Sequence, residues 1–149
     1  MATRSETALE ALKALLMPLE ASVSGLEVVR NPESELPVDG EARHKIAIRD
    51  GTTGEPEVSL SPVSYAYEHE AAIAVSTAKI GRADADAAFS ALVAAIVDRI
   101  DGDQTLGGTV DWIMVGGLNT DEVDENVLAG FKAAIIPVTL YYTTDKALG

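Results

Sequence analysis

The sequence predicts an α+β fold in which two helices pack on one face of a mainly antiparallel sheet. Two segments, residues 3–19 and 84–100, carry apolar side chains at the helical spacing of three and four positions. Other segments alternate apolar and polar side chains, which is typical of half-buried strands. Because one helix, three or four strands, a second helix and two strands follow in that order, we expect both helices on the same side of the sheet.

The composition is that of one globular domain without cysteine chemistry. The chain has 149 residues, 47% of them hydrophobic, which is enough apolar material for a core of ordinary size. The absence of cysteine excludes disulfides, thiolate nucleophiles and cysteine-ligated metal sites. Since neither a repeat nor a linker divides the sequence, we expect residues 1–149 to form a single domain.

Acidic residues outnumber basic ones in both halves of the chain. The sequence has 24 Asp and Glu against 11 Lys and Arg, a formal net charge of −13. Such a surface repels phosphate groups, which argues against tight or sequence-specific nucleic-acid binding. Two interpretations remain: the charge keeps the protein soluble, or it prevents adhesion to nucleic acid that passes nearby.

The sequence has neither the pattern of a membrane anchor nor that of a secretory signal. The longest apolar run, residues 91–97, is far shorter than the ~20 residues that span a bilayer. The first residues lead into a charged helix rather than into an apolar signal core. We therefore expect a protein that is made and used in the cytoplasm and does not contact a membrane.

The first predicted helix has a start signal, an apolar stripe and a stop signal. Thr3 and Glu6 have the spacing of a capping box, with Ser5 as an alternative N-cap. Pro18 and Gly25 end the helix. The stripe consists of Leu9, Leu12, Leu16 and Leu19, widened by Ala8 and Leu15.

The middle of the chain predicts strands separated by polar loops. Residues 26–30 form a short strand, 31–42 an acidic, proline-containing loop and 44–49 a second strand. Residues 50–54 then form a hairpin turn or a longer loop, and residues 58–77 a long strand. One face of these strands carries His44, Ile46 and Ile48, followed by Tyr65, Tyr67, His69, Ala71, Ile73 and Val75.

The last third predicts the second helix and two more strands. The helix covers residues 84–100, and a strand over 110–115 ends at Gly116-Gly117. The final strand covers 131–143, where Pro137 indicates an edge position or a bulge because proline lacks an N–H. We expect Val110, Trp112 and Met114 on one strand face, Ile136, Val138, Leu140 and Tyr142 on another, and Phe89, Leu92, Ile96, Trp112 and Leu140 in the core.

The motifs give no candidate active site. His44 and His69 are the only histidines, and neither has a metal-ligand partner at a suitable spacing. The chain has no G-x-S-x-G elbow, no P-loop and no G-x-G-x-x-G fingerprint. We therefore assign no catalytic, cofactor-binding or metal-ligating residue and expect a protein that is not an enzyme.

Two further groups of residues allow a structural and a functional interpretation. The acidic loop 121–125 lacks the glycine and the spacing of an EF-hand, which favours a solvated or subunit-contacting loop over a calcium site. Tyr65, Tyr67 and His69 share a strand face that could stack on bases, but nearby Lys or Arg side chains are missing. We therefore expect these aromatic side chains to pack in the core or at an interface.

The order of these elements resembles one protein family over nearly the whole chain. An N-terminal helix, an acidic loop and paired strands lead to the alternating segment Tyr65–Glu70. The helix 84–100 follows, then Val110–Ile113, an acidic loop and the closing strand 133–143, with Leu140–Thr144 at its end. This arrangement resembles the tail terminator (tail completion, minor tail protein U-like) family of long-tailed bacteriophages and related gene transfer agents.

The resemblance implies a structural virion protein without enzymatic residues. Such proteins form a ring, usually a homohexamer, that caps the head-proximal end of the tail tube and ends tube growth. The implied partners are further copies of the chain, the tail tube protein and the head–tail connector or stopper protein. The resemblance also implies assembly in the host cytoplasm and a lumen through which DNA passes without specific binding.

The residue-level patterns agree with a ring subunit and leave two alternatives. A sheet with helices on one face leaves its other face and its edges for subunit contacts. We expect the loops 31–42 and 116–130 to contact neighbouring proteins, and Asp121, Glu122, Asp124 and Glu125 to face the lumen. The alternatives are another connector, neck or tube component, or, in a different class, a small ferredoxin-like ligand-binding or enzymatic domain.

Overall fold

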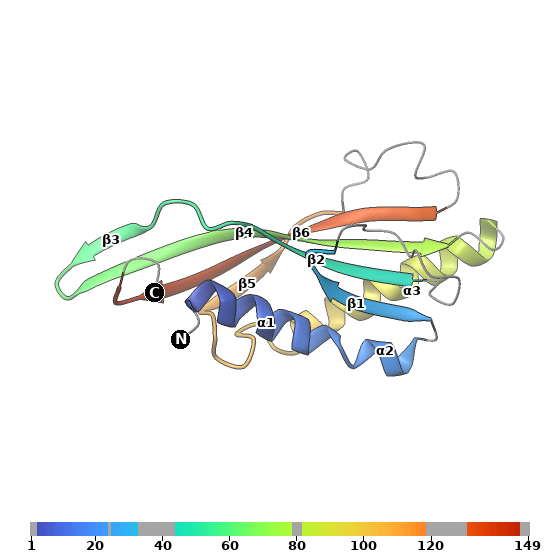
Figure 1. Ribbon diagram of the computed structural model, residues 1–149, viewed down its shortest axis with the longest axis horizontal. Coiled ribbons are helices and arrows are strands. Elements are labelled where there is room, and N and C mark those ends of the chain that lie inside the picture. The colour runs from blue at the N-terminus through green and yellow to red at the C-terminus, as the bar shows by residue number, and fades with distance from the viewer. Residues whose placement is uncertain (1–2, 24, 33–43, 79–81, 119–130, 147–149) are drawn as a thin grey trace.

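A six-stranded sheet with helices on one side makes up the fold (Figure 1). The computed structural model describes residues 3–23, 25–32, 44–78, 82–118 and 131–146. This arrangement confirms the predicted α+β class. In chain order, the elements are α1 (Arg4–Leu16), α2 (Leu19–Ser22), β1 (Leu26–Arg30), β2 (His44–Thr52), β3 (Glu57–Leu60), β4 (Val63–Ala78), α3 (Arg82–Asp101), β5 (Trp112–Val115) and β6 (Phe131–Thr144).

The first helix begins at the predicted cap and ends earlier than predicted. Thr3 is the N-cap, and its side-chain oxygen accepts a hydrogen bond from Glu6 N at 3.2 Å. This bond satisfies one of the free N–H groups in the first turn. Helix α1 ends at Leu16, before Pro18, and α2 follows as a separate short helix. The predicted leucine stripe is buried: Leu9, Leu12, Leu16 and Leu19.

The sheet is mixed, with one parallel pair. Its strand order is β1-β2-β4-β6-β5, and β3 pairs with the first residues of β4. Strands β1 and β2 are parallel, with Leu26 opposite His44, and the other pairs are antiparallel. The prediction of a mainly antiparallel sheet is therefore confirmed, and the parallel pair places β1 at one edge.

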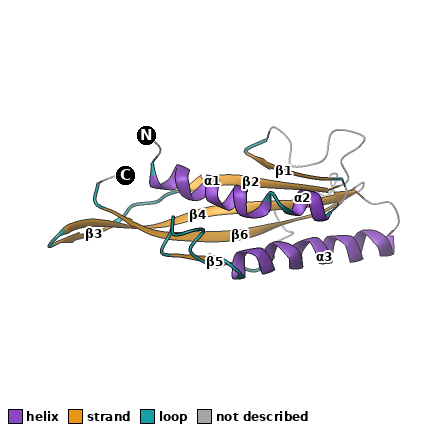
Figure 2. Ribbon diagram, turned by 90° about the horizontal axis from the view of Figure 1, so that it is seen from below, coloured by secondary structure: helices purple, strands orange, loops and turns teal. Residues whose placement is uncertain are grey.

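The core lies between the sheet and the helices, which Figure 2 shows from the helix side. In β4 and β6, the rows that the sequence groups on one strand face point to the helices. They carry Ile73 and Val75 in β4 and Ile136 and Val138 in β6, all of them buried. Four of the five predicted core residues are buried as well: Phe89, Leu92, Ile96 and Leu140.

The fifth, Trp112, lies outside the core, so its predicted burial is wrong. Strand β5 pairs with β6 so that Ile113 lies opposite Leu140 and Trp112 lies opposite Tyr141. Ile113 and Leu140 are buried on the helix side, whereas Trp112 is 44% exposed on the other side. Both rows of this short strand are apolar, so the alternation did not distinguish the core face from the outer face.

Residues 50–54, predicted as a hairpin turn or a longer loop, form a bulge and part of the connection from β2 to β3. The register between β2 and β4 shifts here, and Gly51 has a φ of +67°. The chain continues into β3, turns at Ser61-Pro62 and returns as β4. The long strand predicted over 58–77 is therefore a hairpin, because it contains this second turn.

Pro137 lies in an inner strand, so its predicted edge position is wrong. Strand β6 lies between β4 and β5, and Pro137 pairs with Ala72 of β4. On the other side β5 ends at Val115, and Gly116 N donates to Pro137 O at 2.7 Å. The missing N–H of Pro137 thus lies at the end of the β5–β6 ladder, so it does not break a continuous series of hydrogen bonds.

Truncation of Leu92 should destabilise the fold. Leu92 is buried in the core cluster, so Leu92→Ala should lower the free energy of unfolding by about 2–5 kcal/mol. Urea unfolding measures this change, with Ser90→Ala on the exposed side of the same helix as the control. Equal stability of the two variants would show that α3 packs through a different face.

Candidate functional site

Arg30 in β1 binds three carboxylates from two other elements. Its Nη1 lies 2.9 Å from Glu6 Oε1 and 2.5 Å from Glu10 Oε1 on α1. Its Nη2 and Nε donate to Asp50 of β2 at 2.9 and 3.1 Å. The hydrogen bond with Arg30 lowers the pKa of Glu6, and the same bond raises the pKa of Arg30 further above its ordinary value. This Arg30 cluster joins α1 to the parallel strands.

Asp50 also connects the Arg30 cluster to the core. Its backbone oxygen accepts a hydrogen bond from His69 Nε2, and His69 Nδ1 lies 3.1 Å from the Tyr142 hydroxyl. Since Nε2 carries the hydrogen, Nδ1 accepts from Tyr142. The bulge at Gly51 brings the strands this close, because a Cβ added there would lie 1.8 Å from Glu70 O.

His69 and Tyr142 are structural in this arrangement. Both side chains are buried, both ring nitrogens of His69 are engaged inside the protein, and burial raises the pKa of Tyr142. A general acid or base must come within hydrogen-bond reach of its substrate, which this geometry prevents. Tyr67 is buried on the same face and Tyr65 partly so, which agrees with the packing interpretation of these aromatic residues.

The other residues considered in the sequence do not form a catalytic or metal site in the described chain. His44 Nδ1 lies 3.1 Å from Thr77 Oγ1 and does not meet His69. Most of the loops 31–42 and 116–130, with the acidic segment 121–125, lies outside the described residues. In the described part, no group of three metal-ligating side chains could hold an ion, and no helix has the length and apolar character to cross a membrane.

The chain itself partly closes the sheet edges formed by β1 and β5. At the β1 edge, Glu20 Oε1 accepts a hydrogen bond from Val28 N at 2.8 Å. At the β5 edge, Gln104 O accepts from Ile113 N at 3.0 Å. Because open edge groups are what pairs with strands of another chain, these bonds favour the faces of the sheet over its edges as contact surfaces.

At one end the sheet extends beyond the helices. The β3–β4 hairpin and the end of β6 form an arm that projects past the start of α1 (Figure 1). Along the helix-side row of β4, exposure falls from 46% at Val63 to 4% at Tyr67. Val58 and Leu60 of β3 pair with this row, and Leu60 is 79% exposed. We call Val58, Leu60 and Val63 the arm surface.

The opposite side of the sheet carries a second exposed apolar group. Trp112 stacks on Tyr141 with ring centroids 5.5 Å apart and an interplanar angle of 21°. Met114, on the same row of β5, and Pro137 of β6 are exposed beside them. We call Trp112, Met114, Pro137 and Tyr141 the Trp112 face. The described helices lie on the other side of the sheet and leave this face uncovered (Figure 1).

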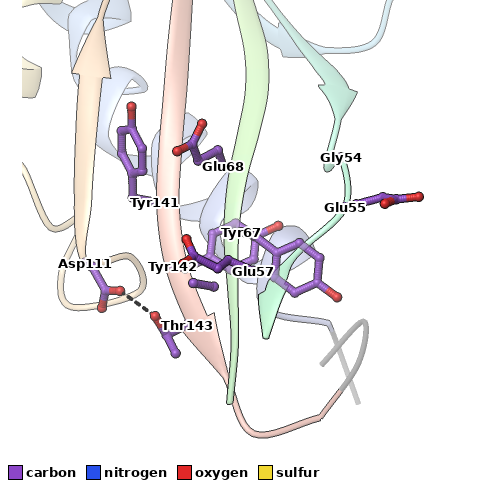
Figure 3. Close-up of a pocket in the computed structure, with 10 residues that line it drawn as sticks. Gly54, Glu55, Glu57, Tyr67, Glu68, Asp111, Tyr141, Tyr142 and Thr143 are labelled. Atoms are coloured by element: carbon purple, nitrogen blue, oxygen red, sulfur yellow. Dashed lines mark hydrogen bonds between the residues drawn. The ribbon is translucent and has the colours of Figure 1, made fainter. Parts of the chain in front are cut away.

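Carboxylates lie beside the Tyr141 end of the Trp112 face. Glu68 lies opposite Tyr141 in the sheet, and Asp111 accepts a hydrogen bond from Thr143 Oγ1 at 3.0 Å. Together with Glu57 they line a pocket of about 480 Å³ formed by β3, β4, the end of β6 and the residue before β5 (Figure 3). None of the residues that line this pocket is a Lys or Arg, so its electrostatic potential is negative.

Sequence reasoning missed the Arg30 cluster, the arm surface and the Trp112 face. The cluster joins residues from α1, β1 and β2 that no local pattern relates. The Ser61-Pro62 turn signal within the predicted strand could have identified the arm. The signal for the Trp112 face is a strand with two apolar rows, of which only one can face the core.

Comparison with known proteins adds no assignment. Neither protein-family models nor curated proteins match the chain.

Removal of Arg30 should destabilise the protein in a pH-dependent way. Arg30→Met leaves three carboxylates without their shared cation, and we expect a loss of about 1–2 kcal/mol at neutral pH because the carboxylates are partly exposed. Since the folded state lowers the pKa of Glu6 from its ordinary 4.5, its stabilising share is complete above that value and is lost as the pH falls below it.

Urea unfolding of both proteins between neutral and acidic pH measures this effect. The difference between wild type and Arg30→Met should shrink in acid, and Lys13→Met on α1 is the control for loss of one positive charge. A difference that stays constant through the acidic range would contradict the ionic role of the cluster.

Proposed function

We propose that the chain is the subunit of a tail terminator ring. In this proposal, a homohexamer caps the head-proximal end of a phage tail tube and ends its growth. One side of the ring contacts the tail tube protein and the other contacts the head–tail connector or stopper protein. The protein is a virion component without enzymatic activity, assembled in the host cytoplasm, and DNA passes through its lumen without specific binding.

The observation that carries this proposal is the arm surface. Large apolar side chains that are exposed together often mark a protein contact, whereas a single exposed apolar side chain is common and needs no such explanation. The arm projects past the helices, so it can reach a neighbouring copy (Figure 1). Head-to-tail contacts of one surface with a different surface of the next copy generate rings when the rotation closes.

The charge of the chain supports a channel for DNA. Each Lys or Arg that neutralises a phosphate adds affinity, with a salt slope of about −0.9 per contact on duplex DNA. A ring of chains with a net charge of −13 avoids such contacts and lets DNA slide. The acidic segment 121–125 is proposed for the lumen on this ground, although it lies outside the described residues.

Two alternative functions would use different surfaces of the chain or place it elsewhere in the particle. Another connector, neck or tube component would use the same arm surface, and its position in the particle distinguishes it from a terminator. A small ferredoxin-like ligand-binding or enzymatic domain is favoured by one observation, the pocket beside the Trp112 face (Figure 3). Such a domain would act without assembly into a ring.

The proposal predicts several copies of the chain at the head-proximal end of each tail. Quantitative mass spectrometry of purified tails and antibody labelling of particles measure copy number and position. About six copies at the head-proximal end are expected for a homohexamer. A chain that is absent from tails, or present as a single copy in each, would contradict the proposal.

The arm surface can be tested separately. Leu60→Ser should preserve the fold, because the side chain is 79% exposed, and should weaken ring assembly about tenfold for each contact. Mass photometry of the assembled ring measures this loss. Met17→Ser, which alters an exposed apolar residue next to the end of α1, is the matched control. Equal assembly of both variants would exclude the arm surface as a ring contact.

A further inference from the structure

The Trp112 face has an apolar centre and carboxylates beside its Tyr141 end. Trp112 is stacked on Tyr141 and still 44% exposed, with Met114 exposed in the same row. Glu68 lies opposite Tyr141 across the β4–β6 pair, and Asp111 immediately precedes Trp112. An exposed apolar centre with a polar border is the composition of a protein contact surface.

We propose that the Trp112 face docks a basic, partly apolar segment of another protein. An Arg or Lys side chain of that partner lies over the stacked rings of Trp112 and Tyr141, where cation–π attraction is available. Its charged group reaches Glu68 and Asp111, and a neighbouring apolar side chain covers Met114. The pocket lined by Glu57, Glu68 and Asp111 receives the longest of the basic side chains (Figure 3).

The partner binds to the face of the sheet rather than as an added strand. Addition of a strand would require the free backbone groups of β5, and Ile113 N already donates to Gln104 O at 3.0 Å. The side chains of Trp112 and Met114 point away from the helices and are not blocked in this way. Recognition therefore depends on side-chain chemistry and on charge.

Charge complementarity selects a basic partner over a second copy of this chain. A second copy would bring a net charge of −13 toward the carboxylates of this face and be repelled there, whereas the proposed ring contact at the arm surface joins apolar side chains. A segment rich in Lys or Arg meets the carboxylates without this repulsion.

Within the proposed function, this partner is the tail tube protein or the connector protein, and that identity rests on the proposed function. The chemistry of the Trp112 face does not depend on it. A binding experiment with the purified chain therefore tests the inference, while the copy number in tails tests the proposed function independently.

Trp112 is the only tryptophan of the chain, so its fluorescence reports directly on the face. The probe is an amidated peptide of alternating arginine and leucine, five residues long, and the control peptide has glutamine in place of arginine. We expect a saturable fluorescence change with the arginine peptide only. Binding should weaken as the salt concentration rises from about 0.05 M to about 0.5 M, because dissolved ions screen the attraction between the carboxylates and the arginine side chains.

A pair of matched double variants separates the face from the overall charge. Glu68→Gln with Asp111→Asn should weaken binding about 4–25-fold, at about 2–5-fold for each exposed carboxylate. Asp98→Asn with Asp101→Asn removes the same charge from exposed positions of α3 and should change binding less than about twofold.

Three results would overturn the inference. Equal binding of the glutamine peptide would show that charge plays no part. Equal weakening by the two double variants would show attraction to the whole acidic chain rather than to this face. A fluorescence change with protein concentration alone, without peptide, would show that a second copy covers the face. The proposed function has its own test, which is the copy number in tails. If the chain is present in tails in several copies, none of these three results would contradict the proposed function.

Discussion

The two longest strands of this protein, β4 and β6, are longer than the helices, and the helices cover only one side of the sheet. Its exposed surfaces follow from these two constraints. At about 3.3 Å per residue, the 16 residues of β4 span about 50 Å. At about 1.5 Å per residue, the 13 residues of α1 span about 20 Å and the 20 residues of α3 about 30 Å. Because both helices pack on the same side, the arm is left without cover on that side and the Trp112 face on the other.

The hydrogen-bonded network around Asp50 lies at the boundary between the covered sheet and the arm. Its carboxylate binds Arg30, and its backbone oxygen binds His69, which accepts from Tyr142. The bulge at Gly51 directs the chain from β2 toward β3 at the same place. The network thus fixes the start of α1 to the sheet where helix cover ends, and the polar groups buried there are all satisfied in the described chain.

Regular patterns predicted the covered part of the fold, and long-range pairing decided the rest. The cap at Thr3 and the apolar row of β6 follow from residues close in sequence, so spacing alone identified them. The side of the sheet on which Trp112 lies depends on which row of β5 side chains packs beside Leu140, and both rows are apolar. The Arg30 cluster joins three elements, so no local pattern reveals it. The candidate surfaces could not be predicted for the same reason, because exposure depends on how far the helices reach.

Oxidative footprinting of the free chain and of assembled particles tests most directly whether these uncovered surfaces serve assembly. Mass spectrometry assigns oxidation to Trp112 and Met114 on the Trp112 face and to Met17, an exposed reference outside it. Trp112 and Met114 should oxidise readily in the free chain and be protected in particles, while Met17 should change much less. Equal oxidation of Trp112 and Met114 in the two states would show that the Trp112 face takes no part in assembly.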